Sequence, residues 1–179
     1  PLQLAALTRA IRELRSPQLL IAVDHEGGRV QRFRAGFSDI PPMRTLGAHW
    51  DRDVAAAAGE AIRLGWPIAH ELRAHGVDFS FTPVLDLDFG ASTVIGDRAF
   101  HRNPNAAAHL AAALRAGLRA GGMAAVGKHF PGHGHVAADS HVDVPVDPRT
   151  LAEMGADDLV PFATMAAHGL EGVMPAHVI

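Results

Sequence analysis

Residues 121–129, Gly121-Gly122-Met123-Ala124-Ala125-Val126-Gly127-Lys128-His129, carry the pattern that decides the fold. A glycine pair ends a predicted helix, a short apolar run predicts a buried strand, and two polar residues follow directly. The same order of glycine, apolar run and polar residue recurs around Val77 and around Gly172. Repetition of this joint predicts successive βα units, in which a crossover helix joins each strand to the next parallel one.

Apolar runs and alanine-rich helical stretches alternate along the whole chain, so we expect an α/β fold with a parallel sheet. Asn103-Pro104 and Asp147-Pro148 each predict a helix start, because a capping side chain precedes a proline at the first helical position. Pro67 predicts a kink or a break in its helix. The expected strands are residues 19–23, 77–84, 123–127 and 172–176, and the expected helices are residues 2–15, 51–74, 104–120 and 148–167.

The composition narrows the classes of function. The 179 residues are 48% hydrophobic, which predicts a single globular domain. The net charge of −3 and the absence of a basic run argue against nucleic acid or an anionic membrane as a partner and favour a small or neutral substrate. The absence of cysteine excludes disulfides and thiol catalysis. Because the sequence begins with Pro1, we expect it to be cut at its start.

Polar side chains gather where each expected strand ends. Asp24 follows the first strand, Asp86 the second, Lys128 and His129 the third, and His177 the fourth. The carboxyl ends of parallel strands meet at one face, where barrels and doubly wound sheets both place their sites. Long loops at residues 85–103 and 130–147 leave the same face, and loops of that length are usually functional.

The second long loop contains a candidate acid/base pair. Asp139 and His141 are two residues apart in an extended part of the loop, so their side chains point to the same side. The aspartate can hydrogen-bond one ring nitrogen and orient the other toward a substrate. An unperturbed imidazole pKa of about 6.5 suits proton transfer near neutral pH.

Two other interpretations of this loop stay open. It could be a solvated loop with incidental histidines, because ordinary polar residues also concentrate in loops. It could also bind metal through His133, His135, Asp139 and His141, although their spacing departs from the HxHxDH pattern of binuclear zinc hydrolases.

Residues 24–32, DHEGGRVQR, form a second candidate element. The paired glycines predict a tight turn that holds Asp24 and Glu26 near the top of the sheet and sends Arg32 back over it. Asp24 could accept hydrogen bonds from two sugar hydroxyls, or it could be a turn residue. A solvated surface position is the alternative for Arg32, as for any single arginine.

The first long loop contributes weaker signals. Arg98 lies in Ile-Gly-Asp-Arg-Ala-Phe, and taken alone it decides nothing. Asp86 and Asp88 alternate with leucines and could be catalytic carboxylates or could hold the loop, and we favour the second role.

Taken together, DHEGGRVQR and KHFPGHG…DSH, with FTPVLDLD, IGDRAF and VMPAHVI, resemble the bacterial β-N-acetylhexosaminidases of glycoside hydrolase family 3, the type used in peptidoglycan recycling. The resemblance covers essentially the whole chain. It implies a (β/α)8 TIM-type barrel, of which residues 1–179 are a partial N-terminal domain of about four central βα units. By resemblance, roughly two strands would precede Leu2 and two would follow Ile179.

The resemblance also implies the chemistry. It implies retaining hydrolysis of terminal β-linked N-acetylglucosamine from peptidoglycan fragments in the cytoplasm, through a glycosyl-enzyme and without cofactor or metal. His141 would be the general acid/base, paired with Asp139. The residues that would bind the sugar are Asp24, Arg32, Arg98, Lys128 and His129.

The nucleophile implied by the resemblance is an aspartate in an Asp-Asp-Leu-Ser-Met type motif beyond Ile179, so we expect residues 1–179 alone to be inactive. The pair Asp157-Asp158 is not that motif, because it lies within a predicted helix at the wrong end of a βα unit. The remaining alternatives are a family 3 β-glucosidase or other exo-glycosidase, a metal-dependent hydrolase, and a non-catalytic sugar-binding module. The Asp139-x-His141 element favours the N-acetylhexosamine branch.

Overall fold

The computed structural model describes residues 2–136 and 145–179. Its parallel strands are neighbours in space in the same order as in the sequence. β1 pairs with β4 and β5 pairs with β6, and the bridges Ser80–Ala125 and Val84–Lys128 join the two pairs. This order confirms the predicted α/β class and forms part of a barrel wall. The strands are β1 (Ala22–Val23), β4 (Phe79–Ser80), β5 (Val126–Phe130) and β6 (Gly172–Pro175).

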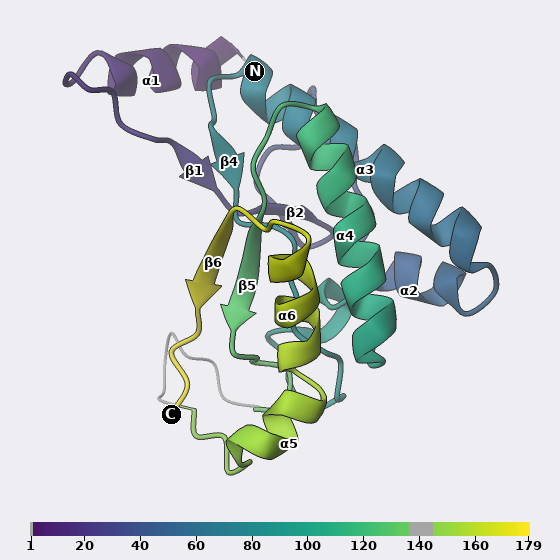
Figure 1. The fold of residues 1–179 in the computed structure, drawn as a ribbon. Helices are drawn as coiled ribbons and strands as arrows, with labels where there is room; N and C mark the ends of the chain where they lie inside the picture. Colours follow the sequence, from purple (N-terminus) through teal and green to yellow (C-terminus); the bar gives the residue numbers. More distant parts are fainter. Residues whose placement is uncertain (1, 137–144) are drawn as a thin grey trace.

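Helices cover the outer face of these strands, and α3, α4 and α6 lie side by side in Figure 1. The backbones of α3 and α4 approach closely because each has a glycine at the crossing. A Cβ on Gly65 would lie 2.3 Å from the Leu114 carbonyl oxygen, and one on Gly117 would lie 2.1 Å from that of Ile62. The helices are α1 (Leu2–Arg12), α2 (Arg44–Trp50), α3 (Val54–Ala74), α4 (Pro104–Ala120), α5 (Leu151–Ala156) and α6 (Leu159–Ala167).

The helix boundaries agree with the prediction at α4 and differ near the end of the chain. The side chain of Asn103 accepts hydrogen bonds from the N–H groups of Asn105 and Ala106, and Pro104 is the first helical residue, as predicted. The prediction of a single helix over residues 148–167 is wrong in two respects. It is divided into α5 and α6 at residues 157–158, and Thr150, rather than Asp147, caps α5 by a capping box with Glu153.

The second predicted helix begins later than expected and is not interrupted. Asp53 caps α3, and the helix continues through Pro67 to Ala74. A proline removes one helical hydrogen bond, but the close packing of α3 on α4 keeps the helix continuous. The helix α2 was not predicted. Gly76 and Gly169 have φ of +80°, as expected for helix stops. After α4 this role belongs to Gly122, with φ of +82°, rather than to Gly121, the expected stop.

The predicted glycine turn is a small hairpin of β2 (His25–Gly27) and β3 (Val30–Gln31). Gly27 and Gly28 have φ of +111° and +53°, a region that side chains other than glycine rarely adopt. The first long loop contains the short 3-10 helix η1 (Gly96–Arg98). Within the described parts of the chain, no helix combines the length and apolar character needed to cross a membrane.

Candidate functional site

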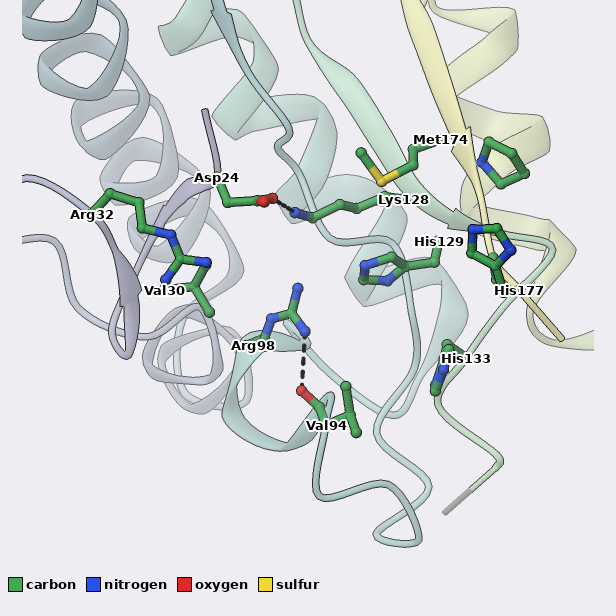
Figure 2. A pocket seen from close by; sticks show the side chains of 12 residues that line it. Asp24, Val30, Arg32, Val94, Arg98, Lys128, His129, His133, Met174 and His177 are labelled. Atoms are coloured by element: carbon green, nitrogen blue, oxygen red, sulfur yellow. Dashed lines mark hydrogen bonds and ion pairs between the residues drawn. The ribbon is translucent and has the colours of Figure 1, made fainter. Parts of the chain in front are cut away.

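A pocket of about 330 Å³ lies at the carboxyl ends of the parallel strands, where the sequence predicted the site. The five residues predicted to bind a sugar all line it, and their role in binding stays a prediction. In Figure 2 the histidines lie on the side opposite Asp24 and Arg32. The lining residues are Asp24, Val30, Arg32, Val94, Arg98, Lys128, His129, His133, Met174, Pro175, Ala176 and His177.

A buried ion-pair network forms one wall of the pocket, with Glu26 at its centre. The carboxylate of Glu26 is 2% exposed and accepts hydrogen bonds from Nε and Nη2 of Arg98, at 2.9 and 2.8 Å. It also lies 2.5 Å from Nζ of Lys128, which in turn lies 2.5 Å from Oδ1 of Asp24. Two buried cations are therefore balanced by two carboxylates.

Burial by itself would lower the pKa of Arg98, but the hydrogen bonds and charge of Glu26 outweigh it and raise that pKa. Arg98 is therefore a permanent cation in the pocket wall. The prediction placed Glu26 near the top of the sheet but gave it no role. Its motif fixes its position directly before the glycine pair, but its partners Arg98 and Lys128 are far away in the sequence, so no local signal identified its role.

The network leaves hydrogen-bonding groups for a ligand. The side chain of Asp24 is 40% exposed, and only its Oδ1 is bound to Lys128. The ammonium of Lys128 has three N–H donors; it donates a hydrogen bond to Asp24 and forms an ion pair with Glu26. Arg32 is exposed and has no hydrogen bond or ion pair with residues 2–136 or 145–179.

The buried carboxylate of Asp86 holds the segment that follows Lys128. Its Oδ2 lies 2.6 Å from Nδ1 of His129, and its Oδ1 accepts a hydrogen bond of 2.7 Å from the backbone N–H of His133. Burial by itself would raise the pKa of Asp86, but the hydrogen bond and charge of His129 and the backbone N–H groups outweigh it and lower that pKa. An anionic Asp86 accepts the proton on Nδ1, so Nε2 of His129 is left for the pocket.

Asp86 therefore has the structural role that the sequence analysis favoured. However, it holds the loop after β5 and not the loop in which it lies itself. Asp88 does hold its own loop, because its Oδ1 accepts a 2.9 Å hydrogen bond from the N–H of Gly90, and it forms an ion pair with Arg44.

Two further histidines line the pocket, and neither was among the residues predicted to bind the sugar, although His133 was a candidate ligand in the metal-binding alternative. His133 is 3% exposed, and neither ring nitrogen has a hydrogen-bond partner among the described residues. His177 follows β6, and the sequence analysis noted its place at a strand end without giving it a function. The predicted acid/base pair, Asp139 and His141, lies outside the described residues, between Val136 and Pro145.

Comparison with known proteins identifies relatives over essentially the whole chain. Residues 2–179 match the model of the glycosyl hydrolase family 3 N terminal domain. A beta-hexosaminidase of Nitrosospira multiformis is 62% identical over 177 residues, which cover 99% of this chain and 51% of the relative.

Solved structures agree with this result. NagZ from Neisseria gonorrhoeae, in complex with N-trifluoroacetyl-D-glucosamine, superposes with a TM-score of 0.95 and 57% identity over 99% of this chain and 52% of that one. A glycoside hydrolase family 3 beta-N-acetylglucosaminidase from Paenibacillus sp. str. FPU-7 superposes with a TM-score of 0.90 and 34% identity, over 99% and 34% of the two chains. The chain spans about half the length of the curated relatives it matches.

Proposed function

Since the chain belongs to glycosyl hydrolase family 3 and matches the N-terminal domain of that family, we propose that the intact protein is a retaining β-N-acetylhexosaminidase. The observation that carries the proposal is the convergence of Asp24, Arg32, Arg98, Lys128 and His129 on one pocket at the carboxyl ends of the strands. The identity of about 60% to relatives named beta-hexosaminidase favours this activity over that of a β-glucosidase.

The pocket suits the terminal sugar of a neutral glycoside. The free oxygen of Asp24 accepts from a sugar hydroxyl, while the third N–H of Lys128 donates to another. Charge-assisted hydrogen bonds of this kind are short and strong, and the paired carboxylates and cations keep the groups oriented before the sugar binds. Nε2 of His129 and the guanidinium of Arg32 add contacts at the sides of the pocket.

The chemistry needs two further groups. His141, oriented by Asp139, gives its proton to the leaving oxygen as the glycosidic C–O bond breaks and an aspartate attacks the anomeric carbon. Water then attacks the glycosyl-enzyme and gives a proton back to the imidazole, so the aspartate leaves as a carboxylate and configuration is retained. The aspartate in question is proposed to follow Ile179 in the intact protein.

The biological substrate is proposed to be a peptidoglycan fragment with a terminal β-linked N-acetylglucosamine, hydrolysed in the cytoplasm. The family resemblance supports both parts. Incubating the intact protein with purified muropeptides should release free N-acetylglucosamine, and fractionation of cells should recover the protein with cytoplasmic markers. Recovery in the periplasm or at the membrane would contradict the location without affecting the activity.

The direct test compares 4-nitrophenyl glycosides of N-acetylglucosamine and glucose as substrates of the intact protein. We expect the N-acetylglucosaminide to have the higher kcat/KM, and Asp24→Asn to lower that value for it by about tenfold or more, because a charge-assisted hydrogen bond is lost. Faster hydrolysis of the glucoside would favour the β-glucosidase alternative. Binding of N-acetylglucosamine without any turnover would favour a non-catalytic sugar-binding module.

Residues 1–179 alone should release no nitrophenol. Trapping the intermediate of the intact protein with a 5-fluoro glycosyl fluoride, followed by peptide mapping, should label an aspartate after Ile179. A label on Asp157 or Asp158 would overturn the location of the nucleophile.

A further inference from the structure

The side chain of His133 is buried in the pocket lining without a hydrogen-bond partner. The residue is 3% exposed, and neither Nδ1 nor Nε2 forms a hydrogen bond with the described residues. A buried polar group that is left unsatisfied destabilises the fold, so nearly all such groups in folded proteins have a partner. The exception at His133 therefore needs a physical explanation.

Other residues also have buried polar side-chain atoms without hydrogen bonds, but among the described residues none of these others lines the pocket. They are His25, Arg44, Thr82, His135 and Asp158. Among the described histidines, His133 is also the only one in which both buried ring nitrogens lack a partner. Within that part of the chain, unused hydrogen-bonding capacity and the pocket coincide at this residue alone.

The contacts around His133 hold its ring in place. The backbone N–H of His133 donates to Oδ1 of the buried Asp86 at 2.7 Å. The next residue, Gly134, packs so closely that an added Cβ would lie 1.8 Å from the carbonyl oxygen of Leu87. The ring itself meets that of His129 in a T-shaped arrangement, with 6.0 Å between the ring centres. A ligand would therefore meet an imidazole that is already positioned, which lowers the entropic cost of binding.

We propose that His133 is a further sugar-binding residue, whose ring forms a hydrogen bond with a polar substituent of the bound N-acetylhexosamine. The inference rests on the proposed function, because it takes this sugar as the ligand of the pocket. In Figure 2, His133 lies on the side of the pocket opposite Asp24 and Arg32. Its hydrogen bond is therefore made to the side of the sugar that faces away from Asp24.

The chemistry of the ring suits this ligand. An imidazole can present one donor and one acceptor, and the hydroxyl and acetamido groups of the sugar can bond to either. Because folding has already removed the ring from water, the sugar supplies a partner that the free protein lacks. Within residues 2–136 and 145–179, no group of three or more His, Cys, Asp or Glu side chains could hold a metal ion, so we assign the ring to the sugar.

The experiment is built on His133→Phe in the intact protein. Phenylalanine keeps an aromatic ring but has no ring nitrogen, so it separates hydrogen bonding from packing. His133→Asn and His133→Gln are the conservative variants, because an amide keeps a donor and an acceptor near the position of one ring nitrogen. His25→Phe is the matched control, since His25 is also buried, at 1% exposed, but does not line the pocket.

Three quantities are measured at neutral pH for each variant. They are the Kd of N-acetylglucosamine by calorimetry, kcat/KM for the 4-nitrophenyl N-acetylglucosaminide, and the midpoint of urea unfolding without sugar. We expect His133→Phe to raise Kd and lower kcat/KM by about three- to thirtyfold, because the sugar loses a hydrogen bond. At least one of the two amide variants should bind more tightly than His133→Phe, and His25→Phe should keep the wild-type Kd.

The unfolding midpoint of His133→Phe should be equal to that of wild type or higher. Replacing an unsatisfied buried polar group by an apolar one of similar shape is neutral or stabilising. Weaker binding without a loss of stability distinguishes a residue that serves a ligand from one that serves packing, because a packing residue would lose stability and leave Kd unchanged.

A wild-type Kd in His133→Phe, or an equal rise of Kd in His25→Phe, would overturn the inference. If His133→Phe lowers the unfolding midpoint, the comparison passes to His133→Leu and His133→Asn, whose side chains are similar in size but differ in hydrogen bonding. Equal Kd values for these two variants would then overturn it. A wild-type protein that neither binds N-acetylglucosamine nor hydrolyses its glycosides would instead contradict the proposed function, so the two failures are distinguishable.

Discussion

The guanidinium of Arg98 forms two hydrogen bonds with the carboxylate of Glu26, 72 residues earlier in the chain, inside the wall of the pocket. Because Lys128 contacts the same carboxylate, Glu26 is the group that keeps two pocket cations in place. A residue that is not part of the pocket lining therefore sets the geometry of two lining residues that are proposed to bind the sugar.

Replacing Glu26 with glutamine should weaken both folding and activity. Removing one partner of a buried ion pair typically costs about 3 kcal/mol, because the remaining charge is left uncompensated. We expect a loss of that order in the free energy of unfolding, measured in urea, and a lower kcat/KM. Glu13→Gln is the control, because Glu13 is exposed after the end of α1, and its effect should be within about 0.5 kcal/mol. Equal stability of the two variants would show that Glu26 does not hold the cations.

Asp86→Asn should lower kcat/KM by about tenfold to a hundredfold, because hydrogen bonds to a charged group contribute about 1.5–3 kcal/mol. The variant still presents an oxygen, so the fold should survive, but the proton on Nδ1 of His129 is held less firmly. Steady-state kinetics of the intact protein with a nitrophenyl N-acetylglucosaminide measure the loss. Asp88→Asn, in the same loop but outside the pocket lining, should change kcat/KM much less.

Asp86→Asn should also change how the free energy of unfolding depends on pH in the acid range. The pKa of Asp86 is lowered in the folded protein, so its contribution to stability is present above the unfolded-state value of about 3.9 and is lost as pH falls through the lower folded value. The difference in unfolding free energy between wild type and Asp86→Asn should therefore be constant near neutral pH and shrink below about pH 4. A difference that grows on acidification would contradict the assignment.

His25 should cause a second pH dependence of the free energy of unfolding, at higher pH than that of Asp86. Its ring is 1% exposed and packs against Phe33 and Phe37, with ring centres 5.8 and 5.9 Å away, and burial lowers its pKa to about 4 from 6.5. The unfolded chain therefore binds a proton first as pH falls, which destabilises the fold progressively between about pH 6.5 and pH 4. At about 1.36 kcal/mol per pKa unit, the loss from this residue is about 3 kcal/mol.

His25→Phe should remove that part of the pH dependence while keeping the aromatic packing. Urea unfolding of wild type and variant between pH 7 and pH 4 measures it as a change in their difference. His70→Phe provides the control, because it makes the same replacement at an exposed histidine, which stacks on Trp66. An identical slope in wild type and His25→Phe would contradict the buried neutral imidazole.

The sequence predicted those features that depend on local pattern. The α/β class, the helix α4 with its Asn103 cap, and the gathering of polar residues at the strand ends all follow from periodicity and from the rule that parallel strands share a carboxyl face. The features it missed depend on contacts between side chains of different structural elements. The break between α5 and α6 follows from the inward pairing of Asp158 with Arg149, and no propensity scale contains that contact.

The same distinction applies to the site. The family resemblance implied Asp24, Arg32, Arg98, Lys128 and His129 as a set, and the structure brings them to one pocket. The role of Glu26 could not be read from its motif, because it is defined by Arg98 in another loop. The roles of Asp139 and His141 stay predictions, since both fall outside residues 2–136 and 145–179.

Gly134→Ala should disturb the loop after β5, because this glycine lies against the backbone of the first long loop. A Cβ at this position would lie 1.8 Å from the carbonyl oxygen of Leu87, which cannot rotate away as a side chain would. We expect a loss of about 1–3 kcal/mol in unfolding free energy, as for other overpacked sites, and a lower kcat/KM, because His129 and His133 share the displaced backbone.

Gly155→Ala is the matched control, since Gly155 lies within α5 and an added Cβ would meet nothing within 4 Å. Alanine favours a helix over glycine by about 1 kcal/mol, so this variant should be at least as stable as wild type and equally active. Thermal unfolding should show lower stability for Gly134→Ala and equal or higher stability for Gly155→Ala. Steady-state kinetics, measured side by side, should show a lower kcat/KM for Gly134→Ala only. If both glycines tolerate alanine equally, the close approach of Gly134 to Leu87 does not constrain the loop, and the low kcat/KM expected for Gly134→Ala should be absent as well.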